Sequence, residues 1–179
     1  MPFAGRIFRN QINESVLHST VLRKSFTYTQ INSGAPEEVF PLLCPVREHD
    51  WLDGWQLTML YSQSGLIEQD CVFATPYDGQ RMALWQVTLY DHLNYLIEFV
   101  RMVPATEVVK INIRLRALEA RTTETTITYQ FTILDADLRE NLQEKLAQDF
   151  YRAMSWWEKA INHYLQHGNK LLRSEAGRE

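Results

Sequence analysis

The sequence is poor in cysteine and has no excess of positive charge. Only two of its 179 residues are cysteine, Cys44 and Cys71, and neither belongs to a spaced Cys or His framework. We therefore expect free thiols in a reducing, cytoplasmic setting, with no disulfide scaffold. Eighteen Lys and Arg residues against 22 Asp and Glu give a formal net charge of −4. Because nucleic-acid affinity depends on clustered basic side chains, we expect no nucleic-acid partner.

Long apolar runs and cofactor motifs are also missing from the sequence. No run approaches the roughly 18 apolar residues of a membrane-spanning helix, and the first residues lack the apolar stretch of a secretory signal. No glycine-rich phosphate loop and no GxSxG elbow occurs. The sequence therefore predicts no transmembrane segment, no cofactor and no hydrolase of the nucleophile-elbow type.

What the chain does contain is a series of strand patterns. Alternation of apolar and polar residues predicts a first strand at 25–31 and a strongly alternating last strand at 123–134. Five further segments rich in strand formers, separated by turn residues, lie between them at 55–61, 66–75, 81–90, 95–103 and 107–118.

Helical patterns interrupt and then follow these strands. Prolines at the start of PEEVFPLL and before VREHDWL predict two short helices between the first two strands. After Asp135 the apolar period changes to three or four residues and continues to Tyr164, which predicts one long amphipathic helix. We expect three parts: an N-terminal extension at 1–24, a folded domain at 25–166, and a flexible C-terminal tail at 167–179 that frays from Gly168.

This element order predicts an α+β fold, in which a bent antiparallel sheet of about seven strands wraps around the C-terminal helix. Such a sheet cannot fill its concave side with its own side chains alone. The helix must cover that side, and any remaining gap becomes a cavity.

One stretch carries a resemblance to a known family. A first strand, then APEEVFPLLCPVREHDWLDGW, then a meander and a final helix resemble the SRPBCC superfamily, the helix-grip or START-like fold. This superfamily includes polyketide cyclase and dehydrase-like proteins, lipid-transfer domains and plant hormone or allergen binding proteins. The resemblance implies a cup for apolar ligands. Only some members of the superfamily are enzymes, and the resemblance carries over no catalytic motif.

The segment PLLCPVREHDWLDGW also presents metal-binding residue types. Cys44, Glu48, His49 and Asp50 all have side chains that bind zinc. However, three of the four are consecutive and point in different directions on a helix. We therefore expect a solvated turn and no metal site.

Candidate ligand-contacting residues follow from the fold, because the core and the cavity lining of a helix-grip domain are the same surface. Trp55 could wall the cavity mouth or pin the short helices, whereas pinning is favoured for Trp51. The candidate lining residues are Trp55, Leu57, Met59, Phe73, Trp85, Ile97, Ile113, Tyr129, Phe150, Met154 and Trp157.

The candidates for proton transfer are Glu98, Glu48 and His49. Glu98 is a single acid in an apolar strand, for which an outward-facing carboxylate is favoured. A carboxyl that faced the cavity would have a raised pKa and could act as a general base.

Three functions remain open. The first is binding, or transport, of a small hydrophobic molecule such as a lipid, polyketide or aromatic metabolite, and a cavity below about 300 Å³ would count against it. The second is a cyclase or dehydratase-like enzyme with a cavity carboxylate or His as general acid or base. The third is a partner-binding module with an exposed apolar patch. The sequence also leaves a homodimer open.

Overall fold

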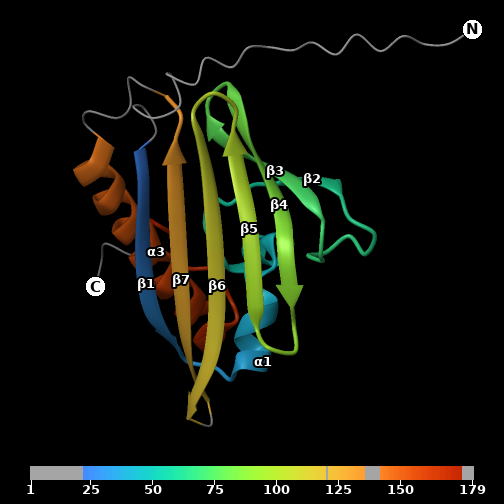
Figure 1. Cartoon of the computed structure of the whole chain (residues 1–179). Coiled ribbons are helices and arrows are strands. Elements are labelled where there is room, and N and C mark those ends of the chain that lie inside the picture. Colours follow the sequence, from blue (N-terminus) through green and yellow to red (C-terminus); the bar gives the residue numbers. More distant parts are fainter. Residues whose placement is uncertain (1–21, 120, 136–141, 175–179) are drawn as a thin grey trace, which may run out of the picture.

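The fold is built on one seven-stranded antiparallel sheet. The computed structural model describes residues 22–119, 121–135 and 142–174. The sheet has the order β1-β7-β6-β5-β4-β3-β2, and Figure 1 views it from its outer face with the helices behind. The strands are β1 (Leu22–Asn32), β2 (Thr58–Tyr61), β3 (Val72–Asp78), β4 (Arg81–Asp91), β5 (Leu96–Val103), β6 (Glu107–Glu119) and β7 (Thr122–Ile133).

Alternating burial along the strands gives the sheet one buried face and one solvent-exposed face. In β6, Val109, Ile111, Ile113 and Leu115 are buried, whereas the residues between them are more exposed. Irregularities in register interrupt the pairing of β3 with β4, β4 with β5, and β6 with β7. Such bulges bend strands, and a bent sheet has the concave inner face that the sequence predicted.

Short helices connect β1 to β2. They are α1 (Pro36–Val39), the 3-10 turn η2 (Phe40–Leu43) and α2 (Pro45–Trp51). The Glu38 carboxylate accepts the backbone N–H of Ala35 at 2.8 Å and so caps α1. Cys44 is extended, as expected for a residue before proline, and separates η2 from α2. The predicted short helices are confirmed, except that the second half of PEEVFPLL, Phe40–Leu43, forms a 3-10 turn.

The long helix α3 (Leu142–His167) covers the inner face and runs along the edge strand β1. Its Glu158 accepts the Tyr28 hydroxyl at 2.5 Å and the backbone N–H of Ile31 at 3.1 Å. Asn162 donates to the Ile31 carbonyl at 2.8 Å and accepts the N–H of Ser33 at 3.0 Å. These contacts satisfy backbone groups that an edge strand would otherwise expose.

Two predicted strands begin later than expected. β2 starts at Thr58 and not at residue 55, and β3 starts at Val72 and not at residue 66. Between them, the Glu68 carboxylate accepts backbone N–H groups of Gln63 and Ser64. Because this loop satisfies its backbone through a side chain, it does not join the ladder.

The chain after α3 is docked and not frayed over its described part. Gly168 adopts a φ of +70°, and its N–H bonds to the Tyr164 carbonyl at 2.8 Å, which ends the helix. Leu171 then forms a parallel bridge with Leu52. The prediction that the chain frays from Gly168 is therefore wrong for 168–174, and the expected extension at 1–24 lies largely outside the described residues.

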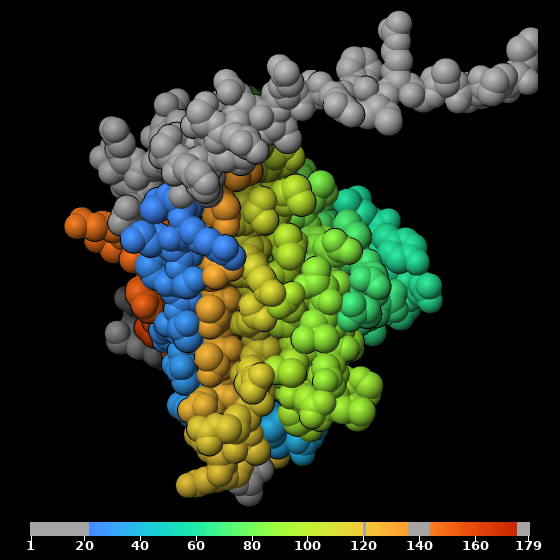
Figure 2. Space-filling view, viewed as in Figure 1, coloured from blue at the N-terminus to red at the C-terminus, as the bar shows by residue number. Residues whose placement is uncertain are grey.

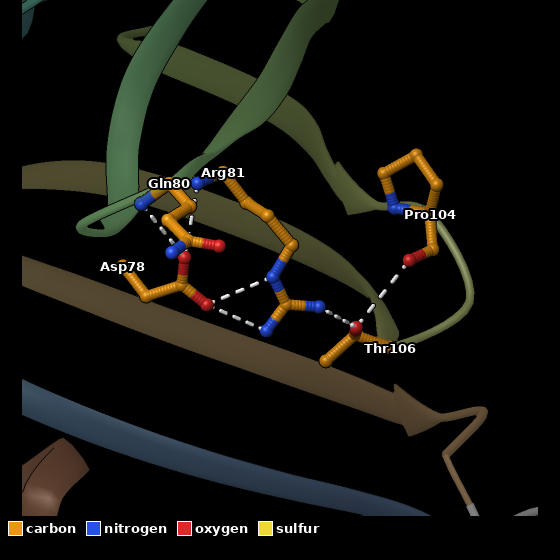
Figure 3. A network of polar contacts seen from close by, with 5 residues as sticks. All are labelled: Asp78, Gln80, Arg81, Pro104 and Thr106. Atoms are coloured by element: carbon orange, nitrogen blue, oxygen red, sulfur yellow. Dashed lines mark hydrogen bonds and ion pairs between the residues drawn. The ribbon is translucent and has the colours of Figure 1, made fainter.

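At one end of the sheet a polar cluster joins the β3–β4 turn to the β5–β6 turn (Figure 3). The Arg81 guanidinium bonds to the Asp78 carboxylate at 2.8 Å and to the Thr106 hydroxyl at 2.7 Å. The Arg81 side chain lowers the pKa of Asp78, and backbone N–H groups add to this effect. The cluster lies outside the cavity lining. Figure 2 shows the outer face, on which strands from β1 (blue) to β4 (green) lie side by side.

Candidate functional site

A cavity of about 470 Å³ lies between the inner face of the sheet and α3. It exceeds the roughly 300 Å³ at the low end of ligand sites. The lining comes from α2, the following loop, β3 to β7, α3 and the docked tail. The lining residues are Pro45, Glu48, Leu52, Gly54, Trp55, Gln56, Phe73, Thr75, Pro76, Trp85, Phe99, Arg101, Ile111, Ile113, Ile127, Tyr129, Ala153, Met154, Trp156, Trp157 and Arg173.

The exposed lining residues mark the mouth of this cavity. Gly54, Gln56, Pro76 and Arg173 are solvent-exposed, whereas the lining residues on β6 are buried. At this rim the backbone N–H of Arg173 bonds to the Asp53 carboxylate at 3.1 Å. The Arg173 guanidinium lies over the Trp156 ring, 4.7 Å from its centre. The docked tail therefore forms part of the rim.

Aromatic rings make up much of the wall. Four of the five tryptophans, Trp55, Trp85, Trp156 and Trp157, line the cavity. Register places Phe73 directly opposite Trp85, and their rings stack with centres 5.4 Å apart. Phe99 meets both rings edge to face. Such packing fixes flat apolar surfaces around the space.

Three indole N–H groups are tied to the protein. Trp51 donates to the Leu42 carbonyl at 2.9 Å and packs edge to face on Trp157, with ring centres 5.1 Å apart. Trp51 is fully buried and pins the short helices, as the sequence favoured. Trp55 combines the two predicted roles: it donates to the Pro45 carbonyl at 2.8 Å, which holds the short helix α2, and it lines the cavity. Trp85 donates to the Thr75 hydroxyl at 2.9 Å.

Glu48 is the acid of the cavity. It sits on α2, is 8% exposed and belongs to the lining. None of the residues that the structure describes forms a hydrogen bond or ion pair with its carboxyl. Burial raises the pKa of Glu48 well above its ordinary value, because the charged form loses hydration and gains no partner.

Tyr129 and Arg101 are two further polar residues of the inner lining. Burial raises the pKa of Tyr129 to about 12, with Arg101 lowering it and Glu48 raising it in smaller measure. These charge effects indicate that Arg101 and Glu48 each lie near Tyr129. Arg101 forms an ion pair with Glu107 at 2.6 Å and lies over the Trp85 ring at 5.5 Å. Its charge is therefore already balanced.

The predicted lining residues divide into two groups. Phe73, Trp85, Ile113, Tyr129, Met154 and Trp157 line the cavity together with Trp55. The other four pack elsewhere: Ile97 and Phe150 are buried in the solid core, and Leu57 and Met59 are partly buried against it. Whether the lining residues contact a ligand stays a prediction.

The other two proton-transfer candidates do not reach the cavity. Glu98 faces outward on β5, as the alternation favoured, and pairs with Lys110 at 2.7 Å and with the Thr88 hydroxyl at 2.8 Å. Partial burial alone would raise the pKa of Glu98, but the Lys110 and Thr88 bonds and the Lys110 charge outweigh it and lower the pKa. His49 is exposed on α2.

Several lining residues were not predicted. Arg101 shares a strand face with Ile97 and Phe99, so period-two alternation could have placed it inside. Trp156 is adjacent to the predicted Trp157 on α3. Arg173 lies in the segment expected to fray, and no local sequence signal marks its contact with Trp156.

The described residues contain no group of three or more His, Cys, Asp or Glu side chains that could hold a metal ion. Cys44 and Cys71 are both buried and unpaired as thiols, and the Cys44 sulfur accepts the backbone N–H of Ile67 at 3.4 Å. In the same described part of the chain, no helix has the length and apolar character to cross a membrane.

Comparison with known proteins gives structural matches only. No protein-family model matches the chain, and no curated protein sequence matches it. Among solved structures, norcoclaurine synthase from Thalictrum flavum matches with a TM-score of 0.63 at 10% identity, covering 93% of this chain and 98% of the synthase.

Two further solved structures match over most of their length. The Zhui aromatase/cyclase from Streptomyces sp. R1128 has a TM-score of 0.61 at 13% identity, with 84% of this chain and 100% of the cyclase covered. Ara h 8.0201 has a TM-score of 0.60 at 14% identity, with 80% and 98% covered. The predicted helix-grip fold is therefore confirmed, and identities this low show the fold alone.

Proposed function

We propose, from a helix-grip fold that encloses a cavity, that this protein binds one small, largely apolar molecule between the sheet and α3. The observation that carries the proposal is the cavity of about 470 Å³ with an aromatic wall and few polar groups, the usual composition of a small-molecule site. The aromatic wall favours an aromatic metabolite over a flexible lipid, because flat rings stack on flat rings.

The structural relatives are compatible with this proposal. One match is norcoclaurine synthase in complex with dopamine and hydroxybenzaldehyde, with a TM-score of 0.60 at 11% identity and 93% of this chain and 96% of the synthase covered. Another is an aromatase/cyclase. At such identities they support a fold able to hold aromatic molecules and say nothing of which molecule this chain holds.

Native mass spectrometry of the protein purified from cells tests the proposal. We expect one apolar molecule per chain, released by denaturation and identified by its mass and fragments. A protein that carries no such molecule, and that also fails to bind any of a panel of aromatic probes in solution, would overturn the proposal.

A second candidate function is proton transfer, as in a cyclase or dehydratase-like enzyme. The specific observation in its favour is Glu48, a buried carboxyl without a partner beside Tyr129. Burial raises the pKa of this carboxyl, which favours a role in taking up and returning a proton. The released molecule, returned to purified protein, would then be converted, and Glu48→Gln would abolish conversion while binding persists.

A further inference from the structure

The charges around the cavity leave one acid without a counter-ion. Glu48 has no partner among the described residues, while Arg101 is held by Glu107 at 2.6 Å. Tyr129, with a pKa of about 12, is neutral at physiological pH. Arg101 with Glu107 counts as a neutral pair, so the inner lining carries a potential negative charge at Glu48 and no free positive charge to balance it.

The remaining cation of the lining is Arg173, whose charge is not among the causes that shift the pKa of Glu48. Arg173 is exposed at the rim, where its guanidinium lies 4.7 Å from the centre of the Trp156 ring and its backbone bonds to Asp53. The α3 residues of the lining are Ala153, Met154, Trp156 and Trp157, none of which titrates. On α2 itself, Arg47 is paired with Asp50 at 2.7 Å, and His49 is exposed.

The wall of the cavity suits a positive charge. The faces of aromatic rings carry negative potential, and tryptophan faces attract cations most strongly. Arg101 already uses the Trp85 ring in this way, at 5.5 Å. Rings of Trp55, Trp157 and Tyr129 also line the space.

We propose that the molecule bound in this cavity is an aromatic amine, whose ammonium group pairs with Glu48 while its ring occupies the aromatic wall. The inference rests on the proposed binding function and deepens it. An ammonium donates charge-assisted hydrogen bonds to the carboxylate and supplies the counter-ion that the described residues do not provide. A carboxylate ligand would instead bring a second negative charge, and a neutral ligand would leave Glu48 without an ionic partner.

Three probes that share one ring system test this inference by titration calorimetry at pH 7.5. They are 2-(2-naphthyl)ethylamine, 2-(2-naphthyl)ethanol and 2-naphthylacetic acid. We expect the amine to bind at least about tenfold more tightly than the alcohol, the range for a hydrogen bond to a charged group, and the acid to bind most weakly. Glu48→Gln should remove the amine's advantage. Glu98→Gln, the same change on the outer face, should retain it.

A measurement on the unmutated protein keeps the test independent of how Glu48→Gln folds. The ammonium group binds the ionised form of Glu48. At a pH below the pKa that Glu48 has in the ligand-free protein, binding of the amine should therefore release a proton from Glu48. That proton appears as a dependence of the observed heat on the ionisation enthalpy of the buffer. The alcohol should release none.

The outcomes separate the inference from the proposed function. If the alcohol binds as tightly as the amine or more tightly, Glu48 acts as a neutral donor and the amine inference is overturned, while the binding function stands. If the acid binds best, the inference is likewise overturned. If no probe binds, both the inference and the proposal of an aromatic-binding cup fail.

Discussion

At the scale of single residues, two carboxyls illustrate how environment decides ionisation. Glu48 and Glu98 are both partly or fully withdrawn from water. Glu98 has Lys110 and Thr88 as partners, and its pKa is lowered. Glu48 has none among the described residues, and its pKa is raised by burial. Opposite shifts imply opposite effects of pH on folding stability.

Glu48→Gln should stabilise the protein in a pH-dependent way. The folded protein binds the Glu48 proton more tightly than the unfolded chain, so wild-type stability falls as the pH rises from about 4.5 through the raised pKa and then levels off. Glutamine stays neutral and escapes this loss. Thermal melts across this range should show no gain at pH 4.5 and a gain of about 1–3 kcal/mol above the raised pKa, the scale for one unsatisfied buried polar group.

Glu98→Gln is the matched control and should behave in the reverse sense. Its lowered pKa contributes stability that is present above about pH 4.5 and is lost as the pH falls through the folded pKa. The variant should therefore be less stable than wild type at pH 7, by less than about 1 kcal/mol for a partly exposed pair. In acid, the stabilities of Glu98→Gln and of the wild type should become equal. If the stability difference from wild type did not change with pH for either variant, the assignment of the two environments would be contradicted.

At the scale of elements, the alternation of apolar residues in strands and their helical period predicted most of the fold. β1, β4, β5, β6 and β7 lie within a few residues of their predicted bounds because each buries one face. The cavity-facing role of Glu48 could not be decided, since a seven-residue helix gives no reliable face by period alone. The contact of Arg173 with Trp156 is a tertiary contact with no local sequence signal, and the pattern of small and charged residues there predicted fraying.

The docked tail gives the element-scale prediction. The Arg173 guanidinium holds the rim through Trp156, whereas the bond to Asp53 comes from the backbone N–H and survives substitution. Arg173→Ala should therefore loosen the mouth and speed ligand release. A cation–π contact of about 0.5–1 kcal/mol corresponds to a roughly two- to fivefold higher dissociation rate. Stopped-flow displacement of a bound naphthyl probe measures this rate. Arg152→Ala removes an exposed arginine on α3 that is paired with Asp149, and it should leave the rate unchanged.

At the scale of the whole molecule, the cavity means that the core is divided into a solid part and an open part. Ile111 and Ile133 are each 1% exposed and both lie on strands. Both belong to the hydrophobic core cluster, but of the two only Ile111 lines the cavity. The same added volume should therefore have different consequences at the two positions.

Ile111→Phe should fill space that is open in the protein, so its free energy of unfolding should change by less than about 1 kcal/mol while the affinity for naphthyl probes falls about tenfold or more. Ile133→Phe should overpack the solid core and cost about 1–3 kcal/mol, and its affinity should stay near wild type. Urea denaturation and probe titration on both variants measure the two quantities. If both variants were equally destabilised and both bound the probes as wild type does, the space beside Ile111 would not be the ligand site. A larger side chain weakens binding only where it occupies the volume that the ligand needs.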